Sequence, residues 1–423
     1  MEILLSLSVA LIAGLMLSRL AKFAKLPAVT AYLITGILIG PYLLGAFGVK
    51  GLGFTSLEEI ETDFTLIPDV ALGFIAFSIG NEFRLSQLKK IGKQATVIGI
   101  VQAVVATLCV DAALIGLHFI LGEDKFPLSA TIVLGAIASA TAPAATLMVV
   151  RQYKAKGPVT DTLLPVVALD DAVGLVLFAV SFGIAKAVLS GVVDVLSIVV
   201  EPLLEVSLSI ALGAVMGAFI SLFERFFHSR SKRLSLSVAF VFLTVALSMM
   251  QFKVGKVHVA FSPLLTCMMA GTMFCNLCDF SEELMDRLDR WTAPLFILFF
   301  VISGAELELS LFADLKIVLI GLVYIVFRCL GKYYGAGMSA KLLHCDENVT
   351  KYLGITLFPQ AGVALGMAIK AHTLGSVGML VSNITLFSVL IYELVGPFLT
   401  KVALQKAGEI NPEGRISARR KEA

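Results

Sequence analysis

The stretch TLLPVVALDDAVGLVLFAVSFGIA fills residues 162–185, and its only charged residues are Asp170 and Asp171. Eight uncharged residues precede the pair and 14 follow it. At a helical rise of about 1.5 Å per residue, the carboxylates lie roughly 12 Å from the nearer helix end. An ionisable group this deep in a bilayer costs at least about 2.5–3.5 kcal/mol and is functional by default. The alternative is a helix cap or a purely structural polar pair.

The rest of the chain has the same apolar character. Of its 423 residues, 58% are hydrophobic and only 15% are charged, whereas a soluble domain carries roughly 25% charged residues. The apolar residues form blocks of about 20, the length that a helix needs to cross a bilayer. Because lipid cannot satisfy free backbone N–H and C=O groups, such blocks must be helical. The composition excludes a water-facing globule and predicts an all-α polytopic membrane protein. We expect neither an enzyme nor a nucleic-acid partner.

Thirteen apolar segments are predicted to be transmembrane helices. They are residues 3–18, 27–47, 64–80, 94–121, 127–150, 160–186, 202–223, 234–251, 257–276, 291–305, 315–340, 350–369 and 376–400. No basic segment precedes the first of them, so we expect a retained helix rather than a cleaved signal peptide. Residues 1–402 are then one transmembrane domain, and residues 403–423 are a short basic cytoplasmic tail.

The positive charges predict the orientation of the chain. With these helices, the loops on one side of the membrane hold 24 of the 33 Lys and Arg residues, and the loops on the other side hold 7. Cytoplasmic loops are enriched in Lys and Arg. We therefore expect a multi-pass protein of the cell (inner) membrane with its N-terminus outside and its C-terminus in the cytoplasm. This orientation requires an odd number of helices, as thirteen is.

Two basic residues lie inside an apolar segment. Arg328 is near the centre of the uncharged stretch between Lys316 and Lys341, and Lys332 follows it by four residues on the same helix face. Both need anionic partners at this depth, although Lys332 has the alternative of snorkelling to the membrane surface. Asp170 and Asp171 are candidate partners. Three further candidates, equally compatible with helix-end or structural roles, are Glu82, Asp111 and Glu393.

Two of the predicted helices are interrupted. Pro143 lies in SATAPAAT at residues 139–146, and Pro359 and Gln360 lie in FPQAGVALG at residues 358–366. In lipid, a proline inside a helix is tolerated where the freed backbone groups line a cavity or meet another helix. Matching interruptions in the two halves of a transporter indicate a midplane ion site between inverted repeats, with the broken helices crossing. The alternative is two ordinary proline kinks.

The chemistry of Asp170 and Asp171 suits exchange of a proton for a monovalent metal cation. Apolar surroundings and a second nearby negative charge both favour the protonated form of a carboxylate. A bound sodium or potassium ion favours the ionised form and so expels protons. Competition of this kind for one site is the minimum chemistry of exchange, and it needs no resident cofactor.

The chain also resembles the monovalent cation/proton antiporter family, in particular its bacterial sodium/proton antiporter and potassium-efflux antiporter branch. The resemblance covers roughly residues 5–400. It is carried by LPAVTAYLITGILIGP (26–41), IPDVALGFIAFSIGNEFRLSQLKK (67–90), VVALDDAVGL (166–175), LGKYYGA (330–336) and FPQAGVALG (358–366). The double aspartate and the lysine helix are together a specific indication of this family, and each alone is a moderately specific one.

The resemblance implies roles for individual residues. Asp171 would be the main ion- and proton-binding carboxylate, and Asp170 would pair with Lys332 until a cation binds. Thr141 would lend an oxygen near the site. The fold would have thirteen helices divided between a dimerisation domain and a mobile core domain, in a homodimer that serves pH homeostasis. Many relatives carry an aspartate where this chain has Ala142, so this site has one acidic side chain fewer.

We therefore predict a secondary active antiporter that exchanges sodium, or also lithium, for protons by alternating access and moves net charge. Potassium/proton antiport is the alternative within the family. An intramembrane aspartyl protease also needs two buried acids, but side chains of adjacent helical residues diverge by about 100° and do not easily share one water. A passive cation channel is the remaining alternative, which the matched interruptions and opposed buried charges disfavour.

Overall fold

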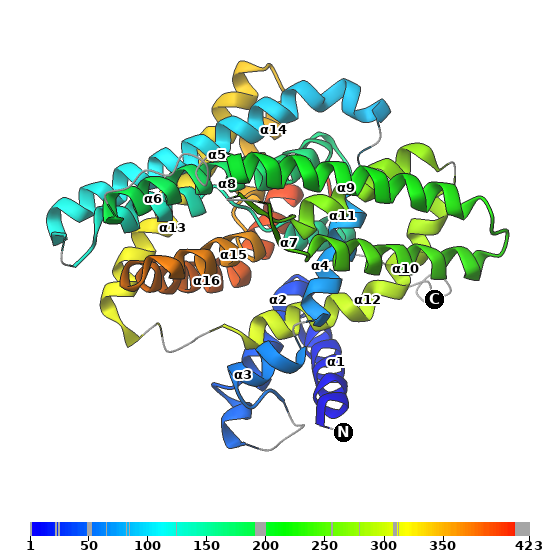
Figure 1. Ribbon diagram of the computed structural model, residues 1–423, viewed down its shortest axis with the longest axis horizontal. Helices are drawn as coiled ribbons and strands as arrows, with labels where there is room; N and C mark the ends of the chain where they lie inside the picture. The colour runs from blue at the N-terminus through cyan, green and yellow to red at the C-terminus, as the bar shows by residue number, and fades with distance from the viewer. Residues whose placement is uncertain are drawn as a thin grey trace. The chain divides into compact units, whose positions relative to one another are not determined.

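The computed structural model describes residues 2–21, 23, 26–48, 53–64, 66–81, 83, 85–123, 125–190, 200–254, 257–278, 280–307, 311 and 313–410. The chain folds into two compact units whose segments alternate along the sequence; Figure 1 labels their elements. Unit 1 comprises Met1–Leu17, Tyr32–Lys90 and Gly174–Leu309, and unit 2 comprises Ser18–Ala31, Ile91–Val173 and Ser310–Ala423.

Helices form almost all of the described secondary structure. They are α1 (Glu2–Ala21), α2 (Ala28–Ile39), η1 (Leu44–Phe47), α3 (Leu57–Glu59), η2 (Ile60–Phe64), α4 (Leu66–Asn81), α5 (Leu85–Leu121), α6 (Leu128–Ile137), α7 (Pro143–Tyr153), α8 (Pro158–Ser190), α9 (Glu201–Glu224), α10 (Arg230–Ser248), α11 (Pro263–Leu277), α12 (Ser281–Ala305), α13 (Leu315–Leu342), α14 (Glu347–Thr356), α15 (Gly362–Ala371), η5 (His372–Leu374) and α16 (Ser376–Lys406). Each of the thirteen predicted segments overlaps at least one of these helices. The all-α prediction is thus confirmed.

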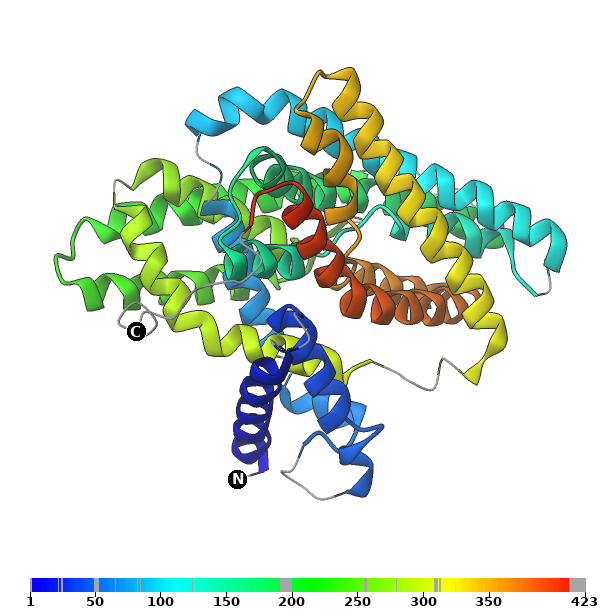
Figure 2. The same cartoon turned by 180° about the vertical axis from the view of Figure 1, so that it is seen from behind.

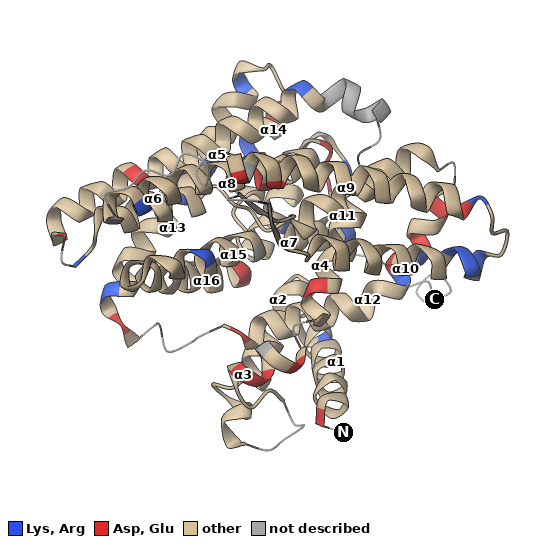
Figure 3. Ribbon diagram, in the orientation of Figure 1, with Lys and Arg blue, Asp and Glu red and all other residues tan. Residues whose placement is uncertain are grey.

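The helices have the length and composition of membrane spans. Over the described residues, eight single helices are long and apolar enough to cross a membrane, and the count is nine if the bent pair Leu57–Phe64 and Leu66–Asn81 forms one span. Most of the ribbon carries neither acidic nor basic residues (Figure 3). The protein is therefore a multi-pass membrane protein, as its composition predicts.

Three predicted helix starts differ from the structure by more than four residues. The first is that of α5, which begins at Leu85 rather than at residue 94. Residues 257–259, predicted to be helical, form β2 (Val257–Val259), which pairs antiparallel with β1 (Phe252–Val254), and α11 begins only at Pro263. β-Branched valines favour this extended backbone, and the Ser262 hydroxyl caps α11 by accepting from Leu265 N–H. In contrast, α12 begins at Ser281 rather than at residue 291, because the ten residues before the apolar block form an amphipathic segment that buries Leu284, Met285 and Leu288.

Unit 1 is held together by helices that approach very closely. α11 packs against α4 and α9. A Cβ atom on Gly80 of α4 would lie 1.8 Å from the carbonyl oxygen of Met268, and one on Gly213 of α9 would lie 2.3 Å from that of Thr266. Only glycine permits such contacts, which let helix backbones pack by van der Waals attraction where lipid supplies no hydrophobic driving force.

Unit 2 contains both interrupted helices and the first half of α8. Its core is formed by fully buried apolar side chains from six helices. These include Ile98 (α5), Val149 (α7), Leu163 (α8), Ala336 (α13), Leu353 (α14) and Leu404 (α16). This packing fixes the helices that carry the polar residues inside the unit.

The two predicted interruptions are present and touch each other. One break separates α6, which ends at Ile137, from α7, which begins at Pro143. The other separates α14 from α15. The backbone N–H of Ala142 donates to the carbonyl of Pro359 at 2.8 Å, so backbone groups freed by one break are satisfied by the other.

Candidate functional site

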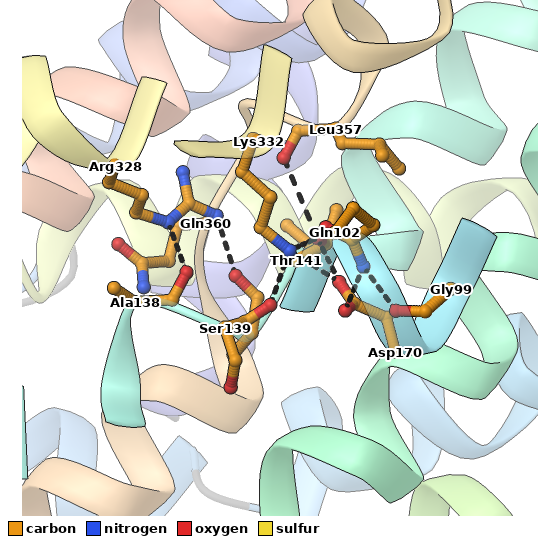
Figure 4. A network of polar contacts seen from close by, with 12 residues as sticks. Gly99, Gln102, Ala138, Ser139, Thr141, Asp170, Arg328, Lys332, Leu357 and Gln360 are labelled. Carbon is orange, nitrogen blue, oxygen red and sulfur yellow. Dashed lines mark hydrogen bonds and ion pairs between the residues drawn. The ribbon is translucent and has the colours of Figure 1, made fainter. Parts of the chain in front are cut away.

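Asp170 and Lys332 form a buried ion pair inside unit 2. Asp170 lies on α8 and Lys332 on α13, and both side chains are 0% exposed. Lys332 Nζ lies 2.8 Å from Asp170 Oδ2 and 3.0 Å from Thr141 Oγ1, and it also donates to the carbonyl of Ser139 (Figure 4). Each of the three ammonium hydrogens therefore has an acceptor.

The carboxylate of Asp170 receives hydrogen bonds at both oxygens. Thr141 Oγ1 donates to Oδ2, which Lys332 also contacts. Gln102 Nε2, from α5, donates to Oδ1 and to the carbonyl of Gly99, the latter at 3.0 Å. Asp170 is therefore fully engaged, which offsets the cost of burying its charge.

Asp171 is in the opposite situation. Its side chain is 1% exposed, yet within the described part of the chain neither of its carboxylate oxygens has a hydrogen-bond partner. Adjacent helical residues point about 100° apart, which separates Asp171 from the partners of Asp170. A buried polar atom without a partner indicates strain, function or an unseen ion or water. The two oxygens of Asp171 are thus available to bind a proton or a cation.

Arg328 binds the broken helices rather than a carboxylate. Its Nε donates to the carbonyl of Ala138 at 2.9 Å, Nη2 to that of Ala140 at 2.6 Å, and Nη1 to that of Phe358 at 2.7 Å. These carbonyls follow the C-terminal ends of α6 and α14, which carry partial negative charge. The prediction that Arg328 has an anionic side-chain partner is therefore wrong for the described residues. The guanidinium neutralises helix ends, and its planar fork of donors suits three acceptors.

The remaining broken-helix residues join the same network. Pro143 is the first residue of α7, where its missing N–H costs no hydrogen bond. Gln360 Nε2 donates to the carbonyl of Ile137 at 2.9 Å, and Tyr324 Oη donates to Gln360 Oε1 at 3.2 Å. Pro359 accepts from Ala142. Ala142, at the position where the resemblance implies an aspartate in many relatives, thus contributes its backbone N–H.

Of the three other carboxylates considered as partners, the structure describes Asp111 and Glu393. Glu82 is outside the described residues. Asp111 on α5 packs against α6, where a Cβ on Gly135 would lie 1.8 Å from Asp111 Oδ1. Glu393 is buried in α16 at 4% exposed. Lys332 instead forms its ion pair with Asp170.

Two glycines bring Lys332 to this position. Gly331 and Gly335 of α13 form a small-xxx-small pair that faces α5, the helix of Gln102. A Cβ on Gly331 would lie 2.6 Å from the Cα of Ala106, and one on Gly335 would lie 2.8 Å from the Cα of Gln102. Figure 2 shows α13 (yellow) crossing α5 (cyan). The close approach explains why glycines flank the lysine.

Gly331→Ala is expected to destabilise the protein by about 1–3 kcal/mol, the usual cost of overpacking. The atom in its way belongs to the backbone of α5, so the two helices must separate. The measurement is the thermal unfolding midpoint in detergent. Gly116→Ala on α5 is the matched control, because nothing lies within 4 Å of a Cβ there. Equal midpoints for the two variants would contradict the expectation.

The segment after α16 caps the helix that carries the two aspartates. Glu409 accepts hydrogen bonds from Val159 N–H at 2.6 Å and from Thr160 N–H at 2.8 Å, and its backbone carbonyl accepts from Lys156 N–H at 3.1 Å. Its carboxylate thus satisfies N–H groups in the first turn of α8, where a negative charge is favourable. Ile410 is buried in the adjoining core.

Gln102 and Ser139 of this network, and Glu409 at the start of α8, were not predicted from the sequence. Gln102 did leave a signal, since a glutamine inside the apolar segment 94–121 needs a polar partner. Ser139 left none, because it acts through its backbone carbonyl. Glu409 was assigned to the tail by composition alone.

Comparison with known proteins identifies a family and a fold. A family model described as "Sodium/hydrogen exchanger, transmembrane" matches residues 7–406. The structure of the sodium proton antiporter MjNhaP1 from Methanocaldococcus jannaschii at pH 8 aligns with a TM-score of 0.70 and 17% identity, covering 95% of this chain and 100% of that one. A 3D EM map of the same antiporter aligns with a TM-score of 0.67 and 17% identity, covering 95% and 94%. No curated protein matches. The structural likeness shows a shared fold.

Proposed function

This chain belongs to the sodium/hydrogen exchanger family, and from that premise we propose that Asp171 binds the cation and the proton in turn, with Asp170 and Lys332 as the pair that opens when a cation enters. The family is one of transporters, not enzymes, and the activity is cation/proton antiport. The observation that carries the proposal is the contrast between two neighbouring acids. Asp170 is saturated with hydrogen bonds, whereas Asp171 has two buried oxygens without a partner among the described residues.

The proposed cycle follows from these contacts. In the closed state Lys332 neutralises Asp170, and Asp171 holds a proton. An arriving cation displaces that proton and replaces Lys332 at Asp170, with Thr141 lending its hydroxyl oxygen. Unit 2, which contains the site, then exposes it to the other side of the membrane by alternating access. The site therefore accepts either the cation or protons, and this competition couples their movements.

We propose that the exchange moves net charge. If Lys332 also releases its proton when the cation replaces it at Asp170, two protons move for each monovalent ion. The membrane potential then contributes about 2.3 kcal/mol per charge per 100 mV. We favour sodium as the cation, with lithium also accepted, and potassium as the alternative. We further propose a homodimer in the cell membrane, with the N-terminus outside and the C-terminus in the cytoplasm.

The geometry opposes the two rival functions. A protease would need both aspartates on one water, but Asp170 is held by Lys332, Thr141 and Gln102. A passive channel would need no group that binds protons in competition with the cation, yet the carboxylate of Asp171 is such a group. A channel predicts cation movement without coupled proton movement. A protease predicts no cation movement.

The test is proton movement in proteoliposomes that hold the purified protein and a trapped pH indicator. Sodium, lithium, potassium or choline is added outside under an imposed pH gradient. We expect an alkali cation to drive proton movement, choline to have no effect, and the rate to change when a potassium–valinomycin diffusion potential is imposed. Cation entry that leaves the internal pH unchanged would exclude antiport and favour a channel.

A further inference from the structure

We propose, on the basis of the function proposed above, that Gln102 is a positioning residue that sets the cation preference of the site by fixing one oxygen of Asp170 independently of Lys332. Gln102 is fully buried on α5. It and Lys332 approach Asp170 from two different helices, and each contacts a different carboxylate oxygen.

The orientation of the amide follows from its neighbours. Gln102 Nε2 has two acceptors, the carbonyl of Gly99 at 3.0 Å and Oδ1 of Asp170. Neither of these oxygens carries a hydrogen in the ion pair, so the NH₂ group must face them and Oε1 must face away. Both N–H groups are therefore committed, one to its own helix and one to Asp170.

The two ends of the Gln102 amide differ in their hydrogen bonding. Oε1 is buried and has no hydrogen-bond partner in the part of the chain that the structure describes. Leaving a buried acceptor unsatisfied costs about 1–3 kcal/mol. An apolar side chain of similar size would avoid that cost but would leave the buried Asp170 Oδ1 without its donor. The amide therefore acts through the N–H groups that it gives to Asp170 and Gly99.

The consequence arises when the ion pair opens. Once Lys332 moves away, Asp170 Oδ2 loses that donor, but Oδ1 is still held by Gln102. The carboxylate then cannot rotate freely, and it presents Oδ2 at a fixed position. Hydrogen bonds that orient a metal-binding side chain raise affinity by about 10–100-fold. A fixed oxygen also distinguishes cations by size, because a freely rotating carboxylate adapts to any of them.

The packing of α13 supports this division of roles. Gly335 lies against the backbone of Gln102, with a Cβ–Cα distance of 2.8 Å if a Cβ were present. The backbone of Gln102 is thus held against α13, the helix that also carries Lys332. The donor from α5 can stay in place while the lysine side chain moves.

The experiment compares Gln102→Leu, which removes the N–H groups at similar size, with Gln102→Glu, which keeps the shape. Thr107→Val on the same helix is the control. Thr107 is also buried, at 6% exposed, and its hydroxyl lacks a partner among the described residues. Proton movement is measured in proteoliposomes over a range of sodium, lithium and potassium concentrations, to separate KM from kcat.

We expect Gln102→Leu and Gln102→Glu to raise KM for the preferred cation by about 10–100-fold, with kcat nearly unchanged, and to bring the KM values of the three cations closer together. Thr107→Val should match the wild type. A purely structural role would lower the thermal midpoint while KM and the cation preference stay the same, and that result would overturn the inference. Wild-type protein without any cation-driven proton movement would instead refute the proposed function itself.

Discussion

Asp171→Asn is expected to reduce cation-driven proton movement to the level of liposomes without protein. Asparagine keeps the shape of aspartate but can neither bind a proton at this position nor neutralise a cation. Leaving a buried charge without its counter-charge costs about 3–5 kcal/mol, which at 1.36 kcal/mol per factor of ten corresponds to a loss of more than about 100-fold. Because the wild-type oxygens have no partner among the described residues, the substitution breaks no contact there and the protein should remain folded.

The control for this variant is Asp161→Asn, which makes the same chemical change in the first turn of the same helix, where the side chain is exposed. Both variants should elute from a sizing column and unfold on heating as the wild type does. Only Asp171→Asn should lose exchange. Undiminished exchange by Asp171→Asn would show that the proton and the cation bind elsewhere.

The second large effect concerns the Asp170–Lys332 pair. Asp170→Asn and Lys332→Met are each expected to lower the free energy of unfolding by about 3–5 kcal/mol, because each leaves one fully buried charge without its partner. The double variant leaves no such charge, so it should be more stable than the sum of the two losses predicts. All three variants should have severely reduced exchange, since the opening pair is gone.

Thermal midpoints of the wild type, both single variants and the double variant complete this cycle. The ion pair is supported if the stability loss of the double variant is smaller than the sum of the two single losses by most of one of them. Strictly additive losses would mean that the two charges do not stabilise each other, and the proposed closed state would then be wrong.

The buried charges and the helix breaks could be predicted from the sequence because both are costly in lipid. Asp170, Asp171 and Lys332 each interrupt a long uncharged segment, and the structure brings Asp170 and Lys332 to 2.8 Å. Their functional roles stay predictions. Pro143 and Pro359 indicated the two breaks as a matched pair, one in each half of the chain. Proline alone does not, since Pro165, Pro294 and Pro397 lie inside continuous helices.

The contacts that could not be predicted involve backbone atoms or residues that are far apart in the sequence. Arg328 binds carbonyls at the ends of α6 and α14, and a carbonyl has no sequence pattern. The positions of charged residues in the sequence could only suggest a carboxylate as the partner of Arg328. The apolar pattern also placed the start of α12 too late, because charged residues interrupt the apolar run while Leu284, Met285 and Leu288 of the same segment are buried.

The docking of Gly408–Ile410 onto α8 decides where the protein can be altered for purification. An affinity tag joined directly after Lys406 would replace Glu409, whose carboxylate accepts from Val159 and Thr160 at the start of the helix that bears Asp170 and Asp171. Such a protein would carry a frayed first turn in the helix of both acids. A tag joined beyond Ile410 leaves that turn intact and is the safer choice for measurements of transport and stability.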